Sequence, residues 1–138
     1  MMNMYVEATG PGTNYGIENL SLSAEITDVK VKVSGGTNNY GIEQGSLGTL
    51  KLKDVAIDAK GLGDVYYGVH VVNGDVEIEG SKIEASGLGE SNAIYIDPGT
   101  SAARVALTML AGGVSGSNFT CFGSYDGNFL LLDPTTCQ

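Results

Sequence analysis

The chain has 138 residues, with 21 glycines, three prolines and no tryptophan, and its formal net charge is -9. This length fits one domain, the acidic charge disfavours nucleic acids and anionic membranes as partners, and no apolar run is long enough to span a bilayer. The opening Met1-Met2-Asn3-Met4 lacks the basic start and apolar core of a signal peptide. We therefore expect either a cytoplasmic protein or a fragment or mature form whose export signal lies elsewhere.

The chain opens partway through a repeat. Residues 5–10 alternate apolar and polar side chains and end on glycine, and the phrase Tyr15-Gly16-Ile17-Glu18 follows. That phrase returns at residues 40–43, 67–70 and, in a weaker form, 92–95, in steps of 25, 27 and 25 residues (15 to 40, 40 to 67 and 67 to 92). A constant period in the twenties is typical of a solenoid, in which each repeat buries its apolar face against its neighbours.

The second half of each repeat has the period of a β-strand. Residues 26–35, 52–61 and 78–87 align, and apolar and polar side chains alternate in all three segments. We therefore predict an all-β parallel β-helix of about four to five coils, each with three short strands. The predicted single domain, 1–138, comprises a partial first coil (1–14), four repeats (15–117) and a C-terminal cap (118–138).

Alignment of the repeats gives columns of similar side chains, which we expect to stack in the core about 4.8 Å apart. The columns are Ile17, Ile42, Val69 and Ile94; Ile26, Leu52, Ile78 and Leu107; Val6, Val31, Ile57 and Ile83; and Ala8, Val33, Ala59 and Ala85. Corners that need a positive φ are expected at Gly10, Gly35, Gly61 and Gly87.

Strict alternation along the first strand of each repeat also predicts where its polar and aromatic residues point. Tyr15 and its equivalents Tyr40 and Tyr67 should point inward near a corner, where they pack; if the corner exposes them, they could hold sugar rings instead. Gly16 and its equivalents should form a flat outward strip. Asn19 and Gln44 should stack inside as an amide pair.

The stretch 68–83 resembles the repeat of the right-handed parallel β-helix in the pectate-lyase-like superfamily. It is similar to the repeats of uncharacterised parallel β-helix proteins and of periplasmic copper-maturation-type families, through Gly68-Val69-His70-Val71, Val76-Glu77-Ile78 and Ile83. The resemblance covers roughly residues 4–117 and rests on core and corner residues, so it implies the fold and no particular activity. Polysaccharide-degrading members gather acids on one groove, whereas the aspartates here are scattered and Arg104 is the only arginine.

One outward row carries the residues that could perform chemistry. If Ile17 and its equivalents point inward, the row consists of Glu18, Glu43, His70 and Tyr95, one residue per coil. Stacked carboxylates about 5 Å apart match the separation in a retaining glycosidase, so Glu18 and Glu43 are the candidate acid and nucleophile. The same row could bind a divalent metal through its two glutamates and His70, or it could be a solvated strand face. We favour the solvated face, and we expect no cofactor and no metal.

These patterns predict a non-catalytic structural or interaction module whose ligand the sequence does not specify. The alternative is a protein that binds or cleaves a polysaccharide along Glu18, Glu43, His70 and Tyr95. Both hypotheses use the same face of the solenoid, and a fold alone does not choose between them.

The cysteines and the two ends bear on compartment and assembly. A disulfide between Cys121 and Cys137 would pin the C-terminal tail and indicate an extracellular or cell-surface protein, whereas two buried thiols would fit the cytoplasm. Residues 118–138 hold all three phenylalanines and resemble C-terminal segments of uncharacterised bacterial β-helix proteins. The N-terminus has no comparable apolar segment, so we expect a second copy to cover the first coil in a homo-oligomer. Alternatively, the methionines at this end, Met1, Met2 and Met4, fold over it.

Overall fold

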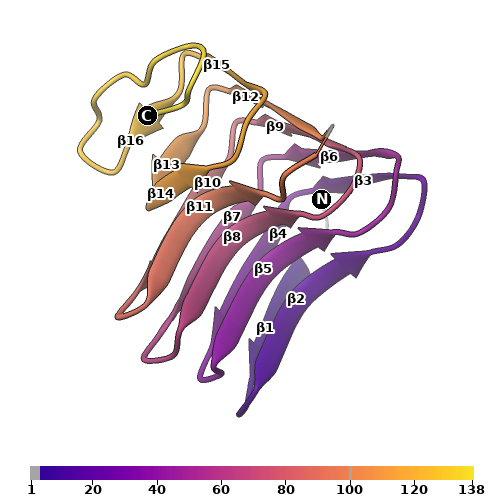
Figure 1. Ribbon diagram of the computed structural model, residues 1–138, viewed down its shortest axis with the longest axis vertical. Helices are drawn as coiled ribbons and strands as arrows, with labels where there is room; N and C mark the ends of the chain where they lie inside the picture. Colours follow the sequence, from indigo (N-terminus) through magenta and orange to yellow (C-terminus); the bar gives the residue numbers. More distant parts are fainter. Residues whose placement is uncertain (1–3, 100) are drawn as a thin grey trace.

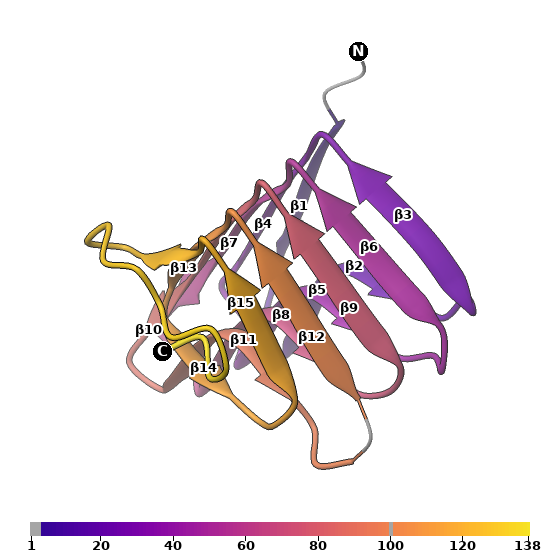
Figure 2. The ribbon, with the colours of Figure 1, turned by 90° about the horizontal axis from the view of Figure 1, so that it is seen from above.

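The computed structural model describes residues 4–99 and 101–138, and every regular element within these residues is a β-strand. The chain winds as a parallel β-solenoid in which successive coils each add one strand to three sheets (Figure 1). Four coils of longer strands are followed by a fifth with shorter strands. The first and last coils lie at opposite ends of the solenoid (Figure 2). The predicted fold class, an all-β parallel β-helix with three strands per coil, is confirmed.

Each of the three sheets contains one strand from every coil, and neighbouring strands pair in parallel. Sheet A contains β1 (Met4–Thr9), β4 (Val29–Ser34), β7 (Ala56–Gly61), β10 (Lys82–Gly87), β13 (Met109–Ala111) and β16 (Tyr125–Asp126). Sheet B contains β2 (Thr13–Asn19), β5 (Asn38–Gln44), β8 (Val65–Val71), β11 (Glu90–Ile96) and β14 (Gly113–Ser115). Sheet C contains β3 (Ser23–Thr27), β6 (Thr49–Lys53), β9 (Asp75–Glu79), β12 (Ala102–Ala106) and β15 (Phe119–Phe122).

The core consists of stacked columns of Val, Ile, Leu and Ala side chains. Val31 pairs with Ile57 and Ile57 with Ile83, and none of the three is more than 2% exposed. One predicted column needs a correction, because Ile78 pairs with Val105 and not with Leu107. Leu107 instead turns the corner between sheets C and A in the left-handed conformation, where its side chain is exposed.

The corner from sheet C to sheet A is a single left-handed residue in every coil. The residues at this corner are Asp28, Asp54, Gly80, Leu107 and Gly123, with φ between 50° and 60°. Aspartate tolerates this region better than most residues because its short side chain bonds locally. Among the corner glycines that the sequence predicts, Gly10, Gly35 and Gly61 have positive φ.

Glycines 16, 41 and 68 interrupt the alternation of sheet B. A Cβ on Gly41 would lie 2.5 Å from the carbonyl oxygen of Gly68 and closer still to Cγ2 of Ile57, so Gly41 faces the core. Ile42 is fully buried as well. Because two successive residues face inward, the strand loses one step of its alternation, as at a β-bulge, and the preceding Tyr40 turns outward. The predicted inward tyrosines and outward glycine strip are therefore wrong.

Side-chain amides pair inside the solenoid, as predicted for Asn19 and Gln44. Asn19 Nδ2 donates to Oε1 of Gln44 at 2.5 Å, and both side chains are buried. A second amide pair, which the sequence analysis missed, joins Asn14 Nδ2 to Oδ1 of Asn39 at 3.1 Å. Tyr66 takes the equivalent position in the next coil, where its buried hydroxyl has no hydrogen-bond partner among the described residues.

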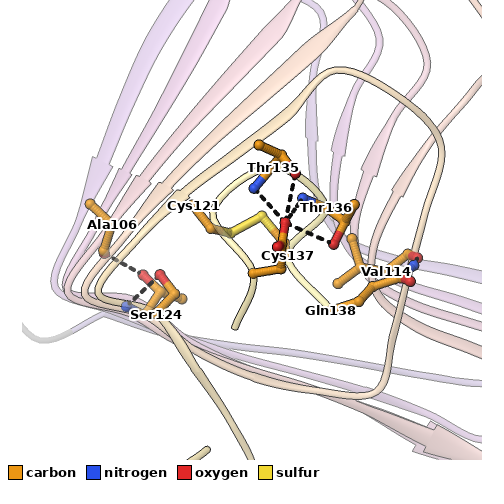
Figure 3. Close-up of a disulfide and its surroundings, with 10 residues drawn as sticks. Ala106, Val114, Cys121, Ser124, Thr135, Thr136, Cys137 and Gln138 are labelled. Atoms are coloured by element: carbon orange, nitrogen blue, oxygen red, sulfur yellow. Dashed lines mark hydrogen bonds between the residues drawn. A yellow bond between two sulfur atoms is a disulfide. The ribbon is translucent and has the colours of Figure 1, made fainter. Parts of the chain in front are cut away.

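The C-terminal segment closes one end of the solenoid. Strand β15 continues sheet C beside β12, so residues 118–138 begin with the last coil and not with the predicted cap. The chain then turns back: Leu132 N donates to Ser124 O at 2.9 Å, and Gln138 Nε2 donates to Val114 O at 2.7 Å. Cys137 forms a disulfide with Cys121 on β15, and both cysteines are buried (Figure 3). The closure therefore consists of backbone and side-chain hydrogen bonds and one covalent bond.

The apolar residues of this segment contribute unequally to the closure. Phe119 is 8% exposed and Leu132 packs against the core, but Phe122, Phe129 and Leu131 are each about three-quarters exposed. Most of the large apolar side chains in the predicted C-terminal cap therefore lie on the surface.

The N-terminal end is open in the part of the chain that the structure describes. Strands β1, β2 and β3 are the edge strands of their sheets. Ile17 and Ile26 are only partly buried, whereas Ile42, the equivalent of Ile17 in the next coil, is completely buried. Of the methionines predicted as an alternative cover, Met1 and Met2 lie outside the described residues, and Met4 belongs to β1 and is 56% exposed.

Candidate binding face on sheet B

The four candidate residues of the sequence lie in one row on the outer face of sheet B. Glu18 pairs with Glu43, Glu43 with His70, and His70 with Tyr95 in the strand register. Their environments differ, because Glu18 is exposed while Glu43 is only 9% exposed. The repeat alignment thus places the row correctly, and the tertiary packing gives each member a different role.

His70 lies between two carboxylates. Its Nδ1 is 2.8 Å from Oε2 of Glu43, and its Nε2 is 3.0 Å from Oδ1 of Asp97. Asp97 directly follows strand β11, so the coils on both sides of His70 each supply one acid. When the imidazole is protonated, its two N–H groups donate to both carboxylates. Glu43 and Asp97 therefore hold the ring in place from both sides.

Four tyrosines and His70 form an aromatic ladder across the same face. Ring centroids are 5.1 Å apart for Tyr15 and Tyr40, 5.5 Å for Tyr40 and Tyr67, and 4.4 Å for Tyr67 and Tyr95. The His70 ring lies 5.1 Å from that of Tyr40. The rings of Tyr67 and Tyr95 are stacked and those of the other two tyrosine pairs are tilted, and this packing covers part of the ring faces. Tyr15, at the open end of the ladder, is 40% exposed.

Glu90 fixes the buried member of the ladder. The hydroxyl of Tyr67 donates to Oε1 of Glu90 at 2.9 Å, and Asn92 Nδ2 donates to the same oxygen at 2.9 Å. Burial, together with the carboxylate of Glu90, raises the pKa of Tyr67 well above its usual value. Burial also raises the pKa of Tyr40. These phenols are therefore neutral hydrogen-bonding groups and not nucleophiles near neutral pH.

Sequence reasoning missed five members of this face. Tyr15, Tyr40 and Tyr67 were predicted to point inward, because a simple alternation rule does not reveal that each glycine and the residue after it both face the core. Glu90 and Asp97 lie on either side of the repeated phrase, so alignment of that phrase does not reveal them. A signal for the tyrosines was present in the repeated Tyr-Gly pair, since a glycine inside a strand pattern indicates a bulge or a close backbone approach.

The charges of the chain are divided unevenly among the three sheets. Sheet A carries Lys30, Lys32, Lys60 and Lys82 with Glu7, Asp58, Glu84 and Asp126. Sheet C carries Lys51, Lys53 and Arg104 with Glu25, Asp75, Glu77 and Glu79. These are all seven lysines and arginines of the chain. Sheet B carries Glu18, Glu43 and Glu90, with Asp97 at the end of β11, so its acids lie on the one sheet without a lysine or arginine.

The outer face of sheet C has a depression of about 470 Å³. Glu77 is one of its lining residues and lies 3.6 Å from Lys51 and 3.2 Å from Arg104. Because each charge has an opposite neighbour on the surface, this depression attracts neither sign of ligand strongly. Within residues 4–99 and 101–138 no group of three or more His, Cys, Asp and Glu side chains could hold a metal ion. The same residues contain no helix that is long and apolar enough to cross a membrane.

Comparisons with known proteins do not supply a function. No protein-family model matches this sequence, and no curated protein and no solved structure is significantly similar to it. What sheet B can bind must therefore be inferred from its own geometry and charge.

Proposed function

We propose that the chain is a non-catalytic β-helical interaction module. The observation that carries this proposal is the engagement of Glu43 and Asp97 with His70 at 2.8 and 3.0 Å. Acids that hold a ring from both sides form a preformed surface, whereas catalysis by the predicted pair would need Glu43 available to a substrate. The resemblance to the pectate-lyase-like superfamily is compatible with this role, because it rests on core and corner residues.

The test is a search for turnover with a matched variant. Purified protein is incubated with a panel of plant, bacterial and animal polysaccharides, and reducing ends and unsaturated products are measured. We expect no product from the wild type or from Glu43→Gln. Turnover by the wild type that Glu43→Gln abolishes, with an unchanged circular dichroism spectrum, would show a catalyst.

The module further assembles with a second copy of itself through its N-terminal coil. Ile17 and Ile26 are partly buried there, while their equivalents in the next coil, Ile42 and Leu52, are at most 1% exposed. The unpaired edges of β1, β2 and β3 offer backbone groups to a further strand. A second copy would pair with the free strand edges and cover the partly buried isoleucines, since it presents the same edge and the same apolar residues.

Light scattering after size exclusion tests this assembly. We expect a mass above the 14.3 kDa of one chain for the wild type. Ile17→Lys should give the monomer. The charged end of the new lysine can reach water when the N-terminal coil is open, but a second copy on this coil would bury the charge. Thr13→Lys, which makes the same charge change on the exposed outer face of β2, should leave the mass unchanged. A monomeric wild type would contradict the proposed assembly.

A second candidate function, carbohydrate binding on the outer face of sheet B, is favoured by the aromatic ladder. Tyr15 exposes 40% of its surface and could stack on a sugar ring, and Glu18 and Tyr95 could accept hydrogen bonds from sugar hydroxyls. A glycan array tests this function. Selective binding that Glu18→Gln or Tyr95→Ala abolishes would support it, and a blank array would refute it.

The Cys121–Cys137 disulfide supports an oxidising location, such as the cell surface or the extracellular space. Mass spectrometry of the protein isolated under thiol-blocking conditions tests this location. We expect two unmodified cysteines before reduction and two blocked cysteines after it. Two blocked cysteines before reduction would indicate a reducing compartment.

A further inference from the structure

We propose that the outer face of sheet B binds a basic, extended peptide segment of a partner protein. This inference rests on the proposed interaction function and specifies the chemistry of the partner. The face in question consists of the aromatic ladder with Glu18, Glu43, Glu90 and Asp97, carried by strands β2, β5, β8 and β11 and the residue after β11.

Charge complementarity selects the partner. The strands of sheet A carry four acids and four lysines, and those of sheet C carry four acids and three lysines or arginines. Sheet B carries no lysine or arginine, and its one basic side chain, His70, contacts Glu43 and Asp97. Among the described residues no basic side chain forms an ion pair with Glu18 or Glu90, so these two exposed acids make the outer face anionic on a chain whose net charge is already -9. A surface of one sign attracts ligands of the opposite sign and steers their approach. Another copy of this chain would not complement it, because neither of the other two faces has a net positive charge.

The geometry of the face suits lysine and arginine side chains. Their methylene stems can lie on the half-buried rings of Tyr40 and Tyr95 and on the exposed ring of Tyr15. A guanidinium group can also stack on the exposed ring of Tyr15. His70 shows how the face holds a nitrogen-bearing ring, since it contacts Tyr40 and is bound at both nitrogens by carboxylates.

The dimensions fit an extended chain. Four coils spaced about 4.8 Å apart span about 15 Å, which is the length of about five residues of an extended peptide. The sheet also needs no rearrangement to accept it, because hydrogen bonds to Glu43, Asp97 and Glu90 already fix the polar groups. A neutral glycan, by contrast, would gain nothing from the charges of Glu18 and Glu90, and the packed tyrosines leave it few ring faces.

The experiment measures fluorescence anisotropy of a labelled peptide of alternating lysine and serine, titrated with the intact, oxidised protein. We expect binding that weakens as salt is added, because the attraction is between exposed charges. Glu18→Gln should weaken it about fivefold, the equivalent of about 1 kcal/mol for an exposed ion pair. Glu25→Gln is the matched control, because Glu25 is also exposed, belongs to the same coil and faces outward from sheet C; it should change the affinity by less than about twofold.

A second measurement does not depend on variants. Amide chemical shifts of isotope-labelled protein should move on peptide addition at β2 and β5 and stay fixed at β3 and β6 of the same coils. Equal weakening by Glu18→Gln and Glu25→Gln would show attraction by net charge alone and would overturn the proposal. Absence of binding at low salt, or shifts confined to sheet A or C, would overturn it as well.

Two outcomes separate this inference from the function on which it rests. If the lysine peptide fails but the array identifies a glycan that moves the same β2 and β5 amides, the face is a binding site with another partner, and only the basic-peptide proposal fails. If the wild type is monomeric and neither peptide nor glycan binds, both proposals fail.

Discussion

Gly41→Ala tests the orientation of the glycines in sheet B, on which the whole outer face depends. The added Cβ would lie 2.5 Å from the carbonyl oxygen of Gly68, an atom of the backbone of the next coil, and closer still to Cγ2 of Ile57. The coils must move apart to accept it, and overpacking of this kind costs about 3 kcal/mol. The reduced freedom of the unfolded chain offsets about 0.5–1 kcal/mol of that cost. We therefore expect a net loss of about 2 kcal/mol in the free energy of unfolding.

The assay is urea and thermal unfolding followed by far-ultraviolet circular dichroism, under oxidising conditions. For a chain of this size about 2 kcal/mol corresponds to a fall of about 7 °C in Tm. Gly99→Ala is the control, because a Cβ there would meet nothing within 4 Å. It should change stability by less than about 0.5 kcal/mol.

The natural sequence already contains an informative exception, Ala93, which occupies the same position in β11. Its Cβ is tolerated because the next strand omits the corresponding residue: Asn92 pairs with Gly113 and Ile94 with Val114. The following strand therefore has no residue that pairs with Ala93. If Gly41→Ala unfolded at the same urea concentration as the wild type, the glycines would point outward and the tyrosine orientation described above would be wrong.

Three further predictions concern the free energy of unfolding: the two tyrosine hydroxyls at positions 66 and 67, the disulfide, and the pH dependence due to Tyr67. Tyr66→Phe should raise the free energy of unfolding by about 1 kcal/mol, because it removes a buried hydroxyl that has no hydrogen-bond partner among the described residues. Tyr67→Phe should lower the free energy of unfolding by a similar amount, because it removes the hydrogen bond to Glu90; changes of the same sign in urea unfolding would contradict this. Reduction of the Cys121–Cys137 disulfide, which joins residues 16 positions apart, should lower the free energy of unfolding by about 3 kcal/mol. An unchanged urea midpoint in dithiothreitol would show that the C-terminal closure does not depend on this bond. Because the pKa of Tyr67 is raised in the folded state, its phenol ionises first in the unfolded chain. The contribution of Tyr67 to the free energy of unfolding should therefore be constant below about pH 10 and should fall above it. If the free energy of unfolding of Tyr67→Phe fell equally steeply above this pH, other groups would be responsible for the loss.

The fold could be predicted from the sequence because repetition supplies the register. The period of 25 to 27 residues aligns Val31 with Ile57 and Ile83, and the same pairs form in sheet A. Asn19 and Gln44 could be paired for the same reason, since identical positions in adjacent coils must lie next to each other in a parallel stack. Alternation was less reliable than alignment, because one bulged glycine reverses every side chain that precedes it in the strand.

The candidate site was predictable only in part. The row of Glu18, Glu43, His70 and Tyr95 follows from the repeat, but Asp97 reaches His70 from outside the repeated phrase. The tyrosine ladder could not be located without knowing that Gly41 faces the core.

The sequence by itself determined the solenoid, its period and the composition of its core, because stacking of identical coils requires only that equivalent residues be alike. Only the tertiary structure decided which side of sheet B the tyrosines occupy, which acids hold His70 and which end of the solenoid is closed. These features depend on contacts between coils and on a backbone bulge, and such contacts are set by close packing in three dimensions and not by the local pattern of any one strand.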